Sequence, residues 1–319
     1  MRDPRLGRFR GFTLTEMLVS IAVLALLALL ISQIMNSATA AMTRGRKGID
    51  ADAEARIIFD RMATDFTRMV RRNDIDFYGK DTTAGTNRPM NGNDQIAFYS
   101  DVRGYYTDSN PSPTATPTRN QRNPISLIGY TVSSDPSGRP QLVRLAKGLT
   151  WESNNGWQGI SHLPIQIIFR WPNVFQFNTT SSATYNGMTD ADFEVISDSV
   201  VRFEYCYLLQ PTSTAAATVS FVPYSTAITG HSTADFCTDV AAIVVSLAIL
   251  DPSSRVIVTD YSELISQTLF QDATAMDTAA FWTTAINQPA FATTARIPKT
   301  AASAVRVYQR RFSLIGNTD

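Results

Sequence analysis

An apolar run near the N-terminus, with an acidic residue at its start, most constrains what this chain can become. Residues 17–31 are apolar except for Ser20, and with their flanks they reach roughly the twenty residues needed to span a bilayer core. Glu16 stands directly before the run. The arginines that precede it are Arg2, Arg5, Arg8 and Arg10. This order predicts a membrane helix whose N-terminus lies in the cytoplasm.

Three interpretations of this segment compete. It could be a plain membrane anchor, or a secretory signal cut at the A-x-A site Ala38-Thr39-Ala40. The run is longer than the 7–15 residues usual in a signal, which weighs against the second. Glu16 weighs against both, because a carboxylate inside a membrane costs on the order of 3 kcal/mol and is rarely kept without a role.

The third interpretation accounts for Glu16. The stretch Gly11-Phe12-Thr13-Leu14-Thr15-Glu16-Met17-Leu18 resembles the processing motif of type IV prepilins and type II secretion pseudopilins. The resemblance implies that prepilin peptidase cuts after Gly11 and methylates Phe12. It also implies that Glu16 pairs with the N-terminal ammonium of a neighbouring prepilin-like subunit. Two charges in an apolar medium each need a partner, so such pairing is physically reasonable.

We therefore divide the chain into four parts. A cytoplasmic leader covers residues 1–11, a transmembrane half-helix 12–35, an amphipathic half-helix 36–73 and an extracytoplasmic β-rich domain 74–319. In the amphipathic half, apolar residues such as Ile58, Met62 and Phe66 recur every three or four positions, which predicts a helix that runs to Arg72. Its charged residues are expected to form a solvated face with some i,i+4 pairs. Gly45 and Gly48 are hypothesised to permit a bend.

The period then changes to that of strands. We expect a strand at 94–102, a hairpin of 123–132 and 139–149 around the turn at 135–138, and strands at 163–171 and 304–314. The alternating pattern of residues 199–209 predicts a strand with one dominant buried face. The continuous apolar run at 239–251 predicts a fully buried central strand. A hairpin is expected to lead from 251–254 into 255–260. Asp260 and Glu263 resemble a capping box that opens a helix over 261–270, and a further helix is expected over 278–288.

The pattern as a whole is similar to a pilin-like α+β fold, with a long N-terminal helix packed on a mostly antiparallel sheet. It has the look of the larger minor pseudopilins, such as the J subunit of type II secretion and the minor pilin PilW. A closer resemblance is to the Verru_Chthon cassette protein C family, through ARIIFDRMATDF, NDQIAFYSDV, ISLIGYTV, DVAAIVVSLAILDPSSR and AVRVYQRRFSL. Polar insertions at 107–124 and 210–231 make the chain longer than a typical J subunit.

Composition limits the chemistry. The chain has 28 basic and 28 acidic residues, 2 histidines and 2 cysteines, which is poor material for a nucleic-acid surface or for a zinc or haem site. In an extracytoplasmic compartment Cys206 and Cys237 could form a disulfide, and the alternative is two separate small hydrophobic residues. Asp190, Asp192 and Glu194 could supply oxygens to Ca²⁺, but the EF-hand spacing is absent.

Other candidate sites are weak. Gly230-His231-Ser232-Thr233-Ala234 does not match the nucleophile elbow, so we expect no catalytic residue, cofactor or metal. Trp151, Trp157 and Trp171 could form a sugar-binding surface but are typical of packing. The leading hypothesis is a non-enzymatic structural subunit of an inner-membrane-anchored filament or secretion machine. The alternatives are a membrane-tethered binding module for an exported protein or carbohydrate, and an anchored enzyme.

Overall fold

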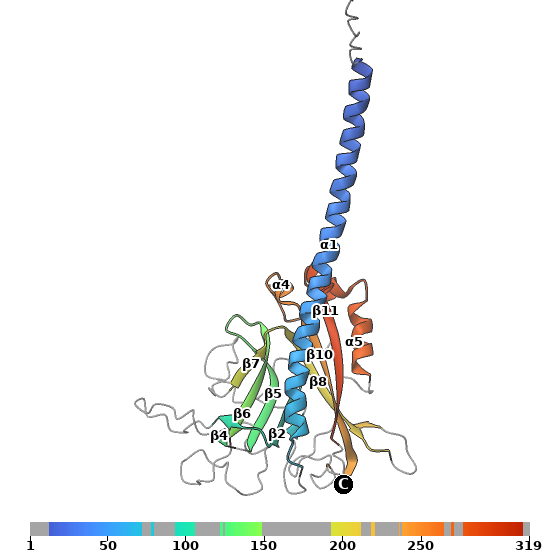
Figure 1. Cartoon of the computed structure of the whole chain (residues 1–319). Helices are drawn as coiled ribbons and strands as arrows, with labels where there is room; N and C mark the ends of the chain where they lie inside the picture. The colour runs from blue at the N-terminus through green and yellow to red at the C-terminus, as the bar shows by residue number, and fades with distance from the viewer. Residues whose placement is uncertain are drawn as a thin grey trace, which may run out of the picture. The chain divides into compact units, whose positions relative to one another are not determined.

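The structure is a computed structural model, and the chain divides by its contacts into two compact units, Met1–Lys47 and Gly48–Asp319. One helix, α1 (Leu14–Thr67), contributes to both units (Figure 1). The described residues are 13–71, 78–79, 93–105, 122–123, 125–148, 193–211, 218–220, 236, 238–264, 269–270 and 277–314. The strand expected at 163–171, and most of both polar insertions, lie outside them.

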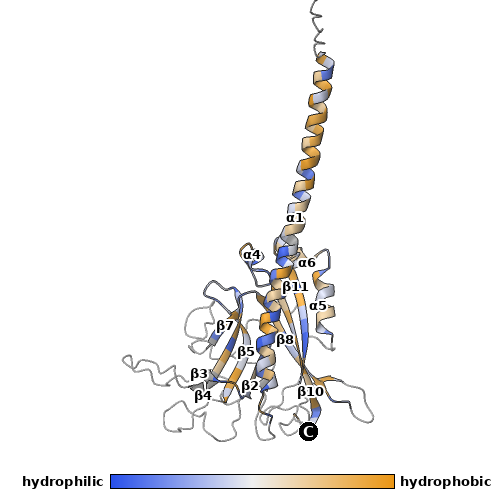
Figure 2. Cartoon of the chain, in the orientation of Figure 1, coloured by the Kyte–Doolittle hydropathy of each residue, from blue (hydrophilic) through white to orange (hydrophobic). Residues whose placement is uncertain are grey.

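The first unit holds the apolar half of α1. Its large side chains are exposed along their length, as in Leu18 (64%) and Leu24 (69%), and Figure 2 shows this half coloured mainly as hydrophobic. An 18-residue window has a mean hydropathy of 2.6 and none of it is buried. By length and composition, α1 is therefore apolar enough to cross a membrane.

The second half of α1 lies across two sheets in the second unit (Figure 1). Its apolar stripe is buried, with Ile58 and Met62 fully covered, as the periodicity predicts. The same core contains Ile96 and Ile128 from one sheet and Ile243 from the other. The helix ends at Thr67, before the predicted Arg72, because the chain turns there to form the Met69–Ser100 bridge.

The first sheet has seven described strands in the order β1-β2-β5-β6-β3-β4, with β7 also paired to β6. Their bounds are β1 Tyr78–Gly79, β2 Gln95–Ser100, β3 Gly104–Tyr105, β4 Arg122–Asn123, β5 Ser126–Ser134, β6 Pro140–Gly148 and β7 Phe193–Ser197. The predicted β5–β6 hairpin is confirmed. Asp135 accepts hydrogen bonds from the Ser137 and Arg139 amides, and Gly138 takes the positive φ of 78° that favours glycine.

The second sheet has the order β11-β10-β8-β9. Its strands are β8 Val200–Leu209, β9 Val219–Ser220, β10 Val240–Leu250 and β11 Val305–Ser313. β10 is central and buried at every position, as predicted. The prediction of one dominant buried face on β8 is wrong, since Arg202, Glu204 and Cys206 are buried as well. A second core covers the other face of this sheet, with Trp282 and Phe291 packed against Ala248.

Short helices lie between β10 and β11 in the chain: α4 Pro252–Arg255, α5 Thr278–Ile286, α6 Phe291–Thr294 and α7 Lys299–Ala302. The last three contribute Trp282, Phe291 and Ala301 to this second core. The hairpin expected after Asp251 is wrong. The Asp251 carboxylate instead caps α4 by accepting from the Ser253 and Ser254 amides. The capping box expected at Asp260 is also wrong, because Asp260 binds the Ser262 amide within a turn and Glu263 pairs with Arg296.

Polar contacts join the two sheets. Just before β2, the Asn93 and Asp94 side chains accept hydrogen bonds from the Phe203 and Tyr205 amides of β8, at 2.6 and 3.0 Å. These side chains substitute for the backbone partners that β8 would otherwise lack. The two sheets and the α1 segment that lies across them therefore share one core, which agrees with a pilin-like α+β fold.

Candidate functional site

The N-terminus of α1 is built around Thr13 and Glu16. The Glu16 carboxylate accepts from the Thr13 amide at 2.9 Å and from the Thr13 hydroxyl at 2.8 Å. In return the Thr13 hydroxyl accepts a hydrogen bond from the Glu16 amide at 3.3 Å. This reciprocal arrangement is a capping box. Gly11 and Phe12 lie outside the described residues.

The capping box gives Glu16 hydrogen-bond partners inside its own chain. The T-x-x-E spacing of Thr13 and Glu16 is the signal in the sequence that predicts this capping box. A carboxylate held by two donors of one residue still carries its full charge. In an apolar medium it would therefore gain further from a cation.

Several hydroxyl groups of the apolar half are satisfied along the helix. The Ser20 hydroxyl donates to the Glu16 carbonyl at 2.7 Å, and Ser32 and Thr39 donate to the carbonyls of Ala28 and Met35. Such i−4 bonds remove the need for outside partners. Glu16 is thus the charged group of this half that an apolar surrounding would disfavour most.

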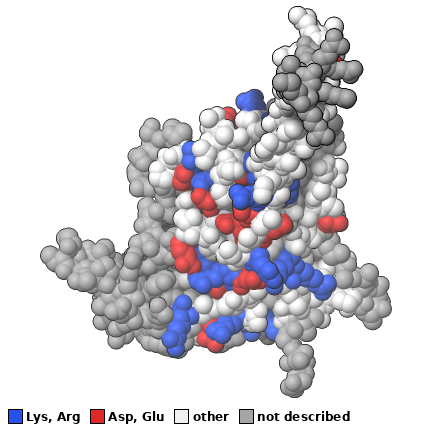
Figure 3. Space-filling model, turned by 45° about the horizontal axis from the view of Figure 1, so that its top comes forward, with Lys and Arg blue, Asp and Glu red and all other residues white. Residues whose placement is uncertain are grey.

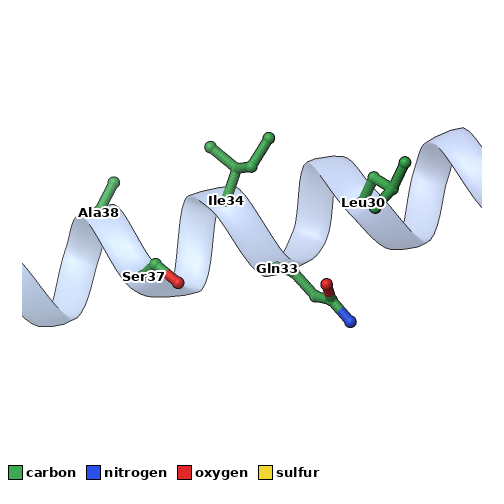
Figure 4. A pocket seen from close by; sticks show the side chains of 5 residues that line it. All are labelled: Leu30, Gln33, Ile34, Ser37 and Ala38. Atoms are coloured by element: carbon green, nitrogen blue, oxygen red, sulfur yellow. The ribbon is translucent and has the colours of Figure 1, made fainter.

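A shallow hollow along the same half is lined by α1 alone among the described residues. Leu30, Gln33, Ile34, Ser37 and Ala38 line it, and Figure 4 shows their side chains projecting from one helix in different directions. Because no second element faces them in this hollow, they form an exposed helix flank.

A buried polar cluster joins α1 to the first sheet. Asp65 of α1 and Arg144 of β6 are 0% and 1% exposed and form a bidentate pair, Nε–Oδ2 at 2.7 Å and Nη2–Oδ1 at 2.9 Å. The Tyr130 hydroxyl of β5 also donates to Asp65. Burial, together with the Asp65 charge, raises the pKa of Tyr130 well above its ordinary value. Sequence analysis missed this cluster, because no local signal links residues so far apart.

Glu194 of β7 extends the cluster to the surface. Its Oε1 lies 2.9 Å from Arg144 Nη1 and 3.1 Å from Arg61 Nη2. Two guanidinium groups already neutralise this carboxylate, which disfavours the Ca²⁺ site considered above. Asp190 and Asp192 lie outside the described residues, and the described part of the chain holds no group of three or more metal-ligating side chains.

The opposite flank of α1 contacts β11. Tyr308 donates to Asp52 at 2.6 Å, and Arg310 donates to Asp60 at 2.7 Å. Burial and the bond to Asp52 raise the pKa of Tyr308. The solvated face expected for the charges of α1 is wrong for Asp65, which is buried. Asp52, Asp60 and Arg61 are exposed as expected, and they pair with strands on either side of the helix.

The other candidate residues cannot be assembled into a site. Cys206 is buried on β8, while Cys237, the two histidines and the three tryptophans considered above lie outside the described residues. The disulfide therefore stays a prediction. On the face drawn in Figure 3, acidic and basic side chains lie side by side, whereas a nucleic-acid surface would gather basic ones.

Comparison with known proteins identifies the N-terminal segment. The prokaryotic N-terminal methylation motif matches residues 6–32. This range includes the capping box and most of the apolar half of α1. No curated protein and no solved structure matches the chain.

Proposed function

Because this chain is a type IV prepilin-like protein with a pilin-like α+β fold, we propose that it is a minor pseudopilin-like structural subunit of an inner-membrane-anchored filament or secretion machine. The observation that carries the proposal is the methylation motif, which places Glu16 at the start of an exposed apolar helix. The role proposed is non-enzymatic. A finer proposal is that the chain is similar to the J subunit of type II secretion, to the minor pilin PilW or to the Verru_Chthon cassette protein C family.

Processing forms the first part of the proposal. Prepilin peptidase cuts after Gly11 on the cytoplasmic face and methylates Phe12. Residues 1–11 leave, while the apolar half of α1 stays in the membrane with the β domain on the extracytoplasmic side. The basic leader supports this orientation through the positive-inside tendency.

Assembly forms the second part. The new ammonium at Phe12 of one subunit and the Glu16 carboxylate of a neighbour each need a counter-charge in the membrane. Glu16 would then form an intersubunit ion pair, either in place of its hydrogen bonds from Thr13 or in addition to them. The exposed apolar side chains of α1 are available to pack on neighbouring helices or lipid.

Replacing Glu16 by Ala or Gln tests the proposal in membranes that contain the other pilin-like subunits. Both variants should be cleaved after Gly11, as intact mass will show, yet lose crosslinking to those subunits by at least about tenfold, the effect of about 1.4 kcal/mol. Ser20→Ala is the matched control, because it lies one turn further along the same helix and its hydroxyl bonds only a backbone carbonyl.

Two results would contradict the proposal. A mature N-terminus at Ala41 would indicate an ordinary secretory signal. Unchanged crosslinking in Glu16→Ala would favour the alternative, a tethered binding module that uses the helix only for localisation.

A further inference from the structure

The Asp65–Arg144–Tyr130 cluster is unusual because it lies inside an apolar core. It places a full ion pair, almost without solvent contact, inside a core otherwise filled by residues such as Phe66 and Ile128. Buried ion pairs are poor sources of stability, because the desolvation of both charges offsets their attraction. Their best-attested use is to select one register among several.

The apolar contacts of α1 select its register only weakly. If the helix slid by one turn, about 5.4 Å, each residue would take the place of the residue four positions earlier. Phe66 would then occupy the Met62 site, and Met62 the Ile58 site. Phe59 would likewise enter the Ala55 site. The fit would be worse, but every one of these sites would still hold an apolar side chain.

The polar contacts do not survive this slip. Met69 would leave its bridge to Ser100 and replace Asp65 opposite Arg144, and the buried guanidinium would keep only the partly exposed Glu194 as a counter-charge. Asp65 would move to the place of Arg61 and face the Glu194 carboxylate.

A slip in the other direction fails as well. Arg61 would then move into the Asp65 site and face Arg144. On the opposite flank Arg56 would replace Asp60 beside Arg310. Each direction therefore removes the bidentate partner of the buried Arg144 and brings like charges together.

We propose that Asp65, Arg144 and Tyr130 form a register lock, which holds α1 at one axial position on the β domain. The lock acts through charge, whereas the surrounding apolar stripe supplies the attraction. This inference does not depend on the filament role, since it concerns a single chain.

Photo-crosslinking of the full-length protein in detergent tests the lock. A p-benzoylphenylalanine at position 308 reports the helix residue opposite β11, which is Asp52 in the native register. Asp65→Leu, Tyr130→Phe and Arg144→Met together replace the cluster by apolar side chains. We expect crosslinks at Arg56, one turn along, to rise from below about 1% of the product to about 10% or more.

Two further variants make the result decisive. Phe291→Ala weakens the second core, away from α1, and should keep the crosslink at Asp52. If the triple variant does not fold, the nearly isosteric Asp65→Asn is used in its place. It too should give crosslinks at Arg56. Crosslinks confined to Asp52 in the folded lock variants would show that apolar packing and the Met69–Ser100 bridge set the register without the cluster, and would overturn the proposal.

Discussion

At the scale of single residues, solvent exposure decides how much an ion pair of α1 contributes. Asp65 and Asp60 lie on the same helix, and each carboxylate pairs with an arginine on a strand. The side chains of Asp65 and Arg144 are 0% and 1% exposed, whereas those of Asp60 and Arg310 are 60% and 42% exposed. Water and salt screen the second pair but not the first.

The two aspartates therefore make a matched pair of substitutions. Asp65→Ala should lower the free energy of unfolding by about 3–5 kcal/mol, because the buried Arg144 loses its bidentate partner and keeps only the partly exposed Glu194, which it shares with Arg61. Asp60→Ala should lower it by less than about 1 kcal/mol. Denaturant unfolding of the full-length protein in detergent measures both, and similar losses would contradict this ranking.

At the scale of elements, α1 is unbroken from Leu14 to Thr67, and both of its glycines lie inside it. A Cβ added at Gly45 or Gly48 would meet nothing within 4 Å, so no close packing requires glycine there. The boundary between the two compact units falls at Gly48. The hypothesis that these glycines permit a bend during assembly therefore stays a prediction.

Alanine at the glycines separates helix stability from bending. Gly45→Ala and Gly48→Ala should each stabilise the helix by about 1 kcal/mol, and Ala53→Gly, at an exposed helix position, should reverse the effect. Thermal melting followed by circular dichroism measures this. If a bend is needed, the alanine variants should also crosslink less to other pilin-like subunits, and unchanged crosslinking would dismiss the bend.

At the scale of the whole molecule, the two phenols beside α1 couple folding to pH. Burial and a neighbouring carboxylate raise the pKa of Tyr130 and Tyr308 in the folded state. A pKa that is higher folded than unfolded contributes stability that is fully present below the unfolded value, about 10, and is lost as the pH rises through the folded value. The β domain should therefore weaken in alkali.

The expected slope is up to about 1.4 kcal/mol of unfolding free energy per pH unit for each phenol above about pH 10. Tyr130→Phe should remove the share of that slope due to one phenol, whatever it does to stability at neutral pH. Phe291→Ala, which keeps both phenols, should retain the full slope. Unfolding measured at several alkaline pH values decides this, and a Tyr130→Phe slope equal to the wild type would contradict the assignment.

Local patterns allowed much of the fold to be predicted. The stripe through Ile58 and Met62, the turn at Gly138 and the continuous apolar run of β10 depend on neighbours in sequence, and the structure has all three. Predictions failed where a local signal had two meanings. Asp251-Pro252 can open a turn or a helix. In the structure the Asp251 carboxylate caps α4, and Arg255 at the end of α4 pairs with Asp198, a contact that is distant in sequence.

The sequence by itself determined that this chain carries the N-terminal methylation motif, because the basic leader, Glu16 and the apolar run are adjacent along the chain. Only the tertiary structure decided which charges of α1 are buried and what they bind. Asp65 meets Arg144 across 79 positions of sequence, through the pairing of strands that no local pattern specifies. The helix follows from residues three and four apart, whereas its register on the sheets follows from contacts that exist only once the chain has folded.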